Sequence, residues 1–314
     1  MRAALLIGFE YEHTDIETLP GISVDLYSSY LCVSTMKMDK IIVYTDLIKD
    51  YSVKNFKKPI VDGNVDSGII SFIEDIKILN QYRQYISTTN NGFNKNNLEK
   101  VIEELLDSRV QEIFIYFTGH AKHEHMILPD NTRIPLNYFR DLFLNKISEN
   151  SSIIFIMDCC NGTGLGLPYT YYPDKIIRNS ILNKDLTGVY KLNTNTEDLK
   201  FFNTTKRILC LSSSKYNQNA VTSKHGSIFS LTLFNLISRW NDKDICRYLP
   251  KILYDINNAL KHKDQTATLH SSNPNILILD PWINSKYSYN NRYYKSIKLF
   301  HPDLDLAIIR IIKR

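Results

Sequence analysis

The sequence predicts an α/β fold with a mostly parallel central sheet and helices on both of its faces. Several short stretches are continuous apolar runs, which is typical of strands whose two faces are both covered. Helix-length amphipathic stretches alternate with these runs, and that alternation favours a parallel sheet between two helical layers. The 314 residues exceed one average domain. We therefore expect one large domain over residues 1–282, followed by a tail over residues 283–314.

The apolar runs give the expected strands, which are Ala3–Phe9, Lys40–Thr45, Glu112–Phe117, Ser152–Met157 and Arg207–Ser212. Amphipathic spacing gives the expected helices, which are Asp25–Thr35, Ile69–Asn80, Asn97–Ser108, Leu136–Ile147, Ser227–Trp240 and Ile245–His262. Asn96 or Asn97 is the expected N-cap before Leu98. The polar stretch from Tyr169 to Lys206 is too long for a simple connection, so we expect a functional or processed segment there.

Composition excludes several classes of protein. Hydrophobic residues make up 43% and charged residues 23% of the chain, which argues against wholesale disorder. The 38 Lys and Arg exceed the 33 Asp and Glu only slightly. Because the basic residues are scattered, we expect no nucleic-acid partner. No stretch approaches the roughly 18 apolar residues of a membrane span, and the apolar N-terminal run is too short for a secretion signal.

The cysteines indicate a reducing compartment. There are five, the number is odd, and no CxxC motif occurs, which argues against a disulfide framework and against a structural zinc site. They are Cys32, Cys159, Cys160, Cys210 and Cys246. We therefore expect a cytoplasmic location.

Two of the expected strands end in reactive residues. The run ending at Phe117 continues into His120, and the run ending at Met157 continues into Cys160. In open α/β sheets the chemistry lies at the carboxyl ends of strands, so these two side chains can meet there. A thiolate is a nucleophile, and a neighbouring histidine lowers the thiol pKa and later protonates the leaving group. The glycine-rich turn after Cys160 can direct a backbone N–H at a developing oxyanion.

Other interpretations of the same residues remain open. A lone cysteine is more often a small buried apolar residue, and a lone histidine is more often structural. His120, His123 and His125 could bind a metal, although no carboxylate pattern completes a site. The glycines at 162, 164 and 166 could form a phosphate loop, but the spacing of GxGxxG fails and no Lys-Ser/Thr pair follows.

Several motifs resemble the metacaspase branch of the caspase-like cysteine peptidases, from Ala3 to about Asp280. The matching stretches are Ala4-Leu-Leu-Ile-Gly-Phe-Glu-Tyr11, Leu19-Pro-Gly-Ile-Ser-Val-Asp25, Lys40-Ile-Ile-Val-Tyr-Thr-Asp46, Tyr116-Phe-Thr-Gly-His-Ala121, Met157-Asp-Cys-Cys-Asn-Gly162, Leu167-Pro-Tyr-Thr-Tyr171, Leu211-Ser-Ser-Ser-Lys-Tyr-Asn-Gln218 and the stretch from Gln265 to Pro274. The resemblance implies a caspase-like fold. It also implies a cysteine endopeptidase linked to regulated proteolysis or cell death. A catalytically inactive homologue that acts as a binding module is the alternative.

The resemblance assigns roles to individual residues. It implies that Cys160, and not Cys159, is the nucleophile, with His120 as acid and base. The backbone N–H groups of Ala121 and Cys160 would bind the oxyanion. Asp25, Asp158 and Thr118 would form the S1 pocket that receives the substrate residue before the cleaved bond. Because two carboxylates can pair with Arg or Lys, we expect protein or peptide substrates cleaved after a basic residue.

Some positions depart from the family pattern. The usual Cys is replaced by Ile22, the second Gly of the family's GHG motif by Ala121, and the His after the nucleophile by Asn161. The carboxylates of the family's calcium site are replaced as well. Those positions hold Gly166, Asn137 and Tyr138. Because a hard cation needs several carboxylates, we expect no cofactor, although Asp130 and Asp174 leave weak calcium binding possible.

The segment from Tyr169 to Lys206 and the tail suggest further properties. If cleavage follows basic residues, the segment offers sites for self-cleavage. These are Lys175, Arg178, Lys184, Lys191, Lys200 and Lys206. The tail is basic and tyrosine-rich, and it becomes apolar after Pro302. We expect it to pack on the domain rather than to bind an acidic partner or a membrane surface. We expect a monomer.

Overall fold

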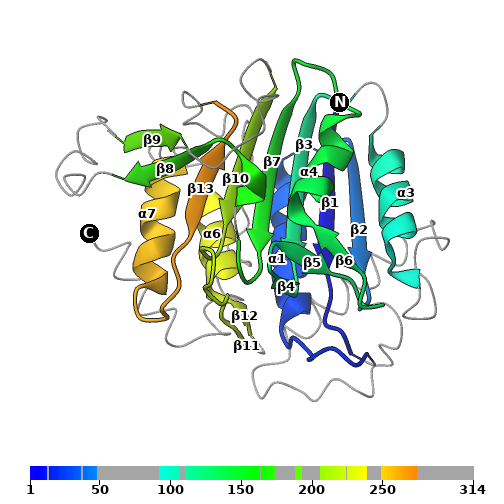
Figure 1. The fold of residues 1–314 in the computed structure, drawn as a ribbon, viewed down its shortest axis with the longest axis horizontal. Coiled ribbons are helices and arrows are strands. Elements are labelled where there is room, and N and C mark those ends of the chain that lie inside the picture. Colours follow the sequence, from blue (N-terminus) through cyan, green and yellow to red (C-terminus); the bar gives the residue numbers. More distant parts are fainter. Residues whose placement is uncertain are drawn as a thin grey trace.

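The computed structural model describes residues 1–12, 14–36, 38–47, 92–106, 110–162, 164–173, 188–192, 206–223, 225–238 and 249–273. An eight-stranded sheet forms the centre of the molecule, in the order β2-β1-β3-β7-β10-β13-β8-β9 (Figure 1). The expected helix Ile69–Asn80, the domain boundary at residue 282 and the tail lie outside the described residues.

The parallel half of the sheet contains the five expected strands. Its members are β2 (Lys40–Thr45), β1 (Arg2–Gly8), β3 (Glu112–Thr118), β7 (Ser152–Asp158) and β10 (Arg207–Ser212). Each neighbouring pair among them is parallel. The predicted strands are therefore confirmed to within one residue at their ends, and so is the mostly parallel α/β fold.

Three further strands make the other half of the sheet antiparallel. They are β13 (Thr268–Ser271), β8 (Tyr169–Pro173) and β9 (Gly188–Leu192). β13 pairs with β10 and with β8, and β8 pairs with β9. β8 and β9 lie within the stretch from Tyr169 to Lys206, which therefore contributes two strands instead of being only a polar connection.

Short strands lie at the carboxyl end of the parallel half. β4 (Ala121–Lys122), β5 (His125–Ile127) and β6 (Arg133–Pro135) form a three-stranded sheet that follows β3. β11 (Thr222–Ser223) and β12 (Gly226–Ser227) form a two-stranded hairpin. Sequence analysis predicted neither feature, because strands of two or three residues carry no periodic pattern.

The described helices match the predicted ones with shifted ends. They are α1 (Ile22–Thr35), α3 (Lys95–Leu105), α4 (Leu136–Leu144), α6 (Ile228–Ser238) and α7 (Leu249–Leu260). α1 begins earlier than expected, and α3 and α4 end earlier. The N-cap of α3 is Asn94, whose side chain accepts a hydrogen bond from the N–H of Asn97, so the expected cap at Asn96 or Asn97 was wrong.

Helices cover both faces of the sheet, which explains why its parallel strands are continuously apolar. One face places Leu6 and Tyr116 against α1, α6 and α7. The other face places Leu5 and Ile115 against α3 and α4. In Figure 1, α4 lies in front of the sheet and α1 behind it.

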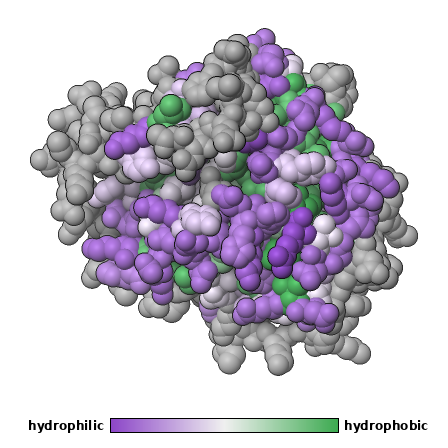
Figure 2. Space-filling model, viewed as in Figure 1, coloured by the Kyte–Doolittle hydropathy of each residue, from purple (hydrophilic) through white to green (hydrophobic). Residues whose placement is uncertain are grey.

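The described surface in the view of Figure 2 is mostly hydrophilic, with apolar side chains in small groups. No helix in the described part of the chain has both the length and the apolar character needed to cross a membrane.

Candidate active site

β3 and β7 bring His120 and Cys160 to the same edge of the sheet. Thr118 and Asp158, at the ends of these strands, are partners in the parallel register. The N–H of Gly119 donates to the carbonyl oxygen of Asp158 at 3.4 Å. His120 and Cys160 each follow this register pair by two residues, so both lie just beyond the carboxyl ends of adjacent strands.

The hydrogen bond of the His120 ring determines its tautomer. Nε2 lies 2.7 Å from the carbonyl oxygen of Glu17. A carbonyl oxygen only accepts hydrogen bonds, so we assign the proton to Nε2 in this contact. In the neutral imidazole Nδ1 is then an acceptor, as a base that receives a thiol proton must be.

Cys160 is the accessible member of the adjacent pair of cysteines. Its side chain is partly buried, whereas Cys159 is 1% exposed. Burial raises the pKa of the Cys160 thiol, and the N–H of Ala220, 3.3 Å from Sγ, opposes that rise. Burial raises the pKa of the Cys159 thiol as well. Burial therefore disfavours the thiolate at both positions, and Cys160 differs from Cys159 in being the more accessible of the two.

Asn161 fixes the turn that presents Cys160. Its φ of 54° lies in the left-handed region, which Asn adopts more easily than most residues. Its side-chain oxygen accepts from the N–H of Asn217 at 3.0 Å, and its own N–H donates to the carbonyl of Gln218 at 2.9 Å. Asn161 therefore joins the cysteine turn to the loop after β10.

The register of β4 and β5 orients the N–H of Ala121. Ile127 donates its N–H to the carbonyl of His120 at 3.0 Å, which makes His120 and Ile127 a hydrogen-bonded pair. Such pairs alternate with non-bonded pairs in an antiparallel ladder. Ala121, which is opposite Met126, therefore directs its N–H away from β5. This orientation suits an oxyanion donor.

Asp25 and Asp158 form a buried acidic pair. Both oxygens of Asp25 accept from the N–H of Ser227, at 2.9 and 3.1 Å. Oδ2 of Asp158 accepts from the Ser230 hydroxyl at 2.5 Å. Within the described residues neither carboxylate forms an ion pair. Burial and then the charge of Asp158 raise the pKa of Asp25 well above its ordinary value. Thr118, 2% exposed, is the register partner of Asp158.

The β11–β12 hairpin lies directly over this acidic pair. A Cβ on Gly226 would lie 2.6 Å from Oδ1 of Asp25, so only glycine permits this approach. Sequence analysis missed Gly226, Ser227 and Ser230. Serines and glycines are common in loops, and no spacing distinguished these three.

A buried arginine lies beside Gly166, one of the positions where the family pattern has a calcium-binding carboxylate. Arg140 is 1% exposed, and its Nη1 donates to the carbonyl of Leu165 at 2.7 Å. A Cβ on Gly166 would lie 3.1 Å from the same nitrogen. Nearby, the Tyr138 hydroxyl donates to Glu99 at 2.6 Å, and the Asn137 side chain accepts from the N–H of Tyr138 at 2.7 Å.

No metal-binding cluster occurs in the described residues. They contain no group of three or more His, Cys, Asp or Glu that could hold an ion. Asp130 accepts from the N–H and hydroxyl of Thr132, and Asp174 lies outside the described residues. His125 Nδ1 contacts the carbonyl of His123 at 2.6 Å, while the His120 ring is turned toward Glu17.

The glycines after Cys160 have packing roles. A Cβ on Gly162 would lie 2.7 Å from the carbonyl oxygen of Ser214. Gly164 has a φ of 64°, and a Cβ there would lie 2.1 Å from Cγ of His270. These close approaches explain the glycines without a phosphate loop.

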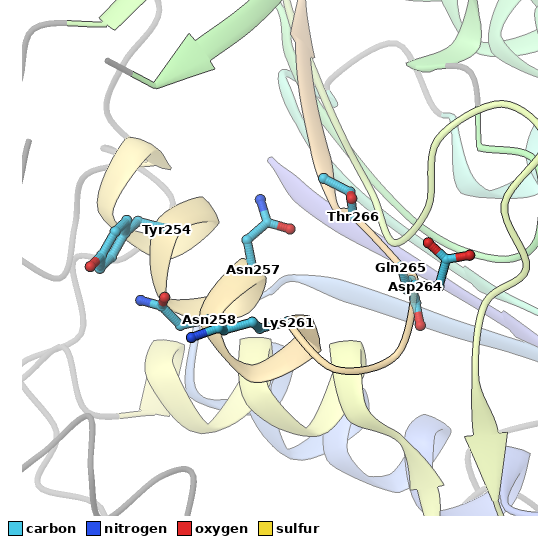
Figure 3. A pocket seen from close by; sticks show the side chains of 7 residues that line it. All are labelled: Tyr254, Asn257, Asn258, Lys261, Asp264, Gln265 and Thr266. Atoms are coloured by element: carbon cyan, nitrogen blue, oxygen red, sulfur yellow. The ribbon is translucent and has the colours of Figure 1, made fainter. Parts of the chain in front are cut away.

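A cavity with polar side chains in its wall lies beside the loop that follows β10. Its volume is about 360 Å³, and α7 and the connection to β13 form its walls (Figure 3). The lining residues are Tyr254, Asn257, Asn258, Lys261, Asp264, Gln265 and Thr266. Gln265 accepts from the N–H of Val221, and the N–H of Thr266 donates to the Gln218 side chain. The cavity wall thus contacts the loop after β10, and this loop in turn contacts Cys160 through the N–H of Ala220.

The fold and this constellation define a class of protein. An α/β domain with a cysteine and a histidine just beyond the ends of adjacent parallel strands is compatible with a cysteine peptidase, in which a histidine activates the thiol. The profile of one family, described as the caspase domain, matches residues 1–278. The chain belongs to this family of cysteine peptidases. Among curated proteins, no sequence matches the chain significantly.

Proposed function

We propose that the protein is a cysteine endopeptidase that uses Cys160 as nucleophile and His120 as acid and base. The observation that carries this proposal is the placement of both residues immediately beyond the Thr118–Asp158 register pair. Cys160 is the accessible cysteine of its pair, and the Nε2 contact of His120 leaves Nδ1 as the acceptor.

The proposed reaction proceeds through a thioester. Nδ1 of His120 accepts the thiol proton, and the Cys160 sulfur attacks the carbonyl carbon of the peptide bond. The N–H groups of Ala121 and Cys160 stabilise the oxyanion. His120 then gives its proton to the leaving amine, and a water molecule activated by His120 hydrolyses the thioester. Because burial raises the thiol pKa, the reaction depends on this base.

Paired substitutions at the adjacent cysteines test the nucleophile. Cys160→Ala removes the attacking sulfur and abolishes hydrolysis of peptides with a basic residue before the cleaved bond. Cys159→Ala removes a buried thiol and retains hydrolysis. Initial rates with a fluorogenic peptide check both variants. Hydrolysis by Cys160→Ala at the rate of the parent would contradict the assignment.

We further propose cleavage after Arg or Lys, as in the metacaspase branch that the motifs resemble. Asp25 and Asp158 support this specificity because both carboxylates are buried and have only neutral hydrogen-bond donors among the described residues. A substrate guanidinium or ammonium group would supply the missing counter-charge. A peptide library in which the residue before the cleaved bond is varied through all amino acids measures the specificity. Preferred cleavage after Asp would refute the proposed preference for Arg or Lys.

One feature favours a second function, that of an inactive homologue acting as a binding module. The hairpin covers Asp25 closely at Gly226, and the N–H of Ala220 already contacts the sulfur of Cys160. A peptide carrying an electrophile and a basic residue distinguishes the two functions. Mass spectrometry detects the adduct on Cys160 if the pocket admits substrate, and no adduct forms on a binding module.

We propose that catalysis needs no calcium. The buried guanidinium of Arg140 supports this, because it lies beside Gly166 and already binds two oxygens there. Its Nη1 donates to the Leu165 carbonyl and its Nε pairs with Asp141 at 2.7 Å. Peptidase activity is therefore expected to survive a chelator. Loss of activity with chelator and its return with calcium would contradict the proposal.

Self-cleavage between residues 174 and 205 is a related proposal. Lys191 lies within β9, where strand pairing opposes cleavage, and the ammonium of Lys206 donates to the carbonyl of Leu144. We therefore expect cuts after Lys175, Arg178, Lys184 or Lys200. Mass spectrometry of the purified protein, with Cys160→Ala as control, identifies the cut. Identical fragments from both proteins would exclude self-cleavage.

A further inference from the structure

The hydroxyl of Tyr11 lies inside the backbone ladder between β4 and β5. The N–H of His120 donates to this hydroxyl at 2.9 Å, and the hydroxyl donates to the carbonyl of Ile127 at 2.7 Å. The second bond of the pair is direct, from the N–H of Ile127 to the carbonyl of His120 at 3.0 Å. A side-chain oxygen therefore replaces one of the two direct backbone bonds that this antiparallel pair would otherwise make.

The His120–Ile127 pair, with the Tyr11 hydroxyl inserted, positions two parts of the proposed site. It fixes the backbone from which the His120 imidazole extends. His120 directly precedes Ala121, so the position of the His120 backbone also sets the direction of the Ala121 N–H. The Tyr11 hydroxyl lies between the N–H of His120 and the carbonyl of Ile127, so it sets the spacing of the two segments at this end. Removing the hydroxyl leaves the N–H of His120 and the carbonyl of Ile127 without this partner.

Tyr11 is itself held firmly in place. It is 0% exposed, and its N–H donates to Oδ2 of Asp46 at 2.8 Å. Its ring centroid lies 4.8 Å from that of His120 and 5.9 Å from that of Phe9. Its φ of 61° is unusual for a bulky residue and costs about 1 kcal/mol or more. Such a conformation persists only where the surroundings enforce it.

Gly119 makes room for the hydroxyl. A Cβ at this position would lie 2.7 Å from the Tyr11 oxygen. The glycine before His120 is therefore required by the close approach of a side chain from the end of β1. Because Gly119 has no side chain, the Tyr11 hydroxyl can reach the backbone N–H of His120.

We propose that Tyr11 is a positioning residue of this site, acting through the backbone of His120 and Ala121. The proposal rests on the peptidase function proposed above. Tyr11 touches no reacting atom. Its hydroxyl sets the geometry of the base and of one oxyanion donor, so its loss lowers the rate of the chemical step and leaves substrate binding at the Asp25–Asp158 pair intact.

Tyr11→Phe tests the role, and Tyr44→Phe is the matched control. Tyr44 is also buried, at 2% exposed, and its hydroxyl donates to the carbonyl of Gly92 in the same core. Both variants lose one hydroxyl and one or two hydrogen bonds. We expect Tyr11→Phe to lower kcat by about tenfold to a hundredfold with KM nearly unchanged. Equal kcat values for the two variants would overturn the proposal.

A second readout separates failure of this proposal from failure of the peptidase function. The pH dependence of Cys160 alkylation by iodoacetamide reports on the His120 partnership and needs no peptide hydrolysis. Tyr11→Phe is expected to shift the midpoint of this profile, and Tyr44→Phe to leave it in place. If the parent hydrolyses no peptide, the peptidase function fails and this profile decides the role of Tyr11. An unshifted midpoint in Tyr11→Phe then overturns it.

Gly119→Ala replaces Tyr11→Phe if that variant does not fold. The new methyl group displaces the hydroxyl from the ladder while the tyrosine remains. The same loss in kcat, or the same shift in the alkylation profile, supports the proposal. Values equal to those of Tyr44→Phe overturn it.

Discussion

Ionisation of Glu10 is expected to destabilise the protein near neutral pH. Glu10 follows β1, and burial, with a smaller contribution from the charge of Asp46, raises its pKa from 4.5 to about 7. The folded state therefore binds this proton more tightly than the unfolded state does. The stability from Glu10 is full below pH 4.5 and is lost as the pH rises through 7. At about 1.4 kcal/mol per pKa unit, the loss reaches about 3 kcal/mol.

Glu10→Gln isolates this contribution, because the amide is a neutral isostere of the protonated carboxyl group. We expect the variant and the parent to have similar free energies of unfolding at about pH 4.5, and the variant to be more stable by about 2–3 kcal/mol at about pH 8. Urea denaturation followed by circular dichroism at several pH values measures the difference. Asp46, whose pKa is raised to about 6, is present in both proteins.

The control for this experiment is Asp15→Asn, which removes one exposed carboxylate from the same segment. It gives the effect of the change in net charge alone. A difference between Glu10→Gln and the parent that stays constant from pH 4.5 to 8 would refute the reasoning, as would an equal pH-dependent gain in the control.

Four further substitutions test the packing around the cysteine turn. Gly164→Ala is expected to lower the free energy of unfolding by about 3 kcal/mol or more, because the new methyl group meets the buried His270 ring. Gly166→Ala, at a similar φ but against a side-chain nitrogen, is expected to cost less in the same denaturation experiment. Arg140→Met is expected to cost about 3 kcal/mol in thermal unfolding, because Arg140 is a buried charged donor. Asn161→Ala is expected to cost about 1–2 kcal/mol and to lower the rate of Cys160 alkylation, whereas a stability equal to that of the parent would contradict the role of its contacts.

The parallel half of the sheet could be predicted because its strands are buried on both faces. Each therefore appears in the sequence as a continuous apolar run. The antiparallel half could not be predicted. β13 has only four residues, Thr268–Ser271, and β8 mixes tyrosines with a threonine and a proline. The start of α1 could not be predicted either. Its N-cap is Gly21, which has a left-handed backbone conformation and no side chain to form a capping hydrogen bond.

The proposed catalytic pair could be located because both residues directly follow strands that the sequence reveals. The contacts that orient the pair could not. Tyr11 reaches His120 across 109 positions, and Ala220 reaches Cys160 across 60. A tyrosine with a positive φ carries no sequence signal, because nothing local demands that conformation. These partners are defined by how the chain folds back on itself.

The order of strands determines what a cut in the backbone would do. β10 and β13 come late in the sequence, yet they lie between β7 and β8, which come before residue 174. A single break between residues 193 and 205 would therefore give two polypeptides whose strands interleave in one sheet. Separating them requires breaking the β7–β10 and β13–β8 ladders together. A nicked molecule is thus expected to migrate as one particle in native conditions and as two chains only after denaturation.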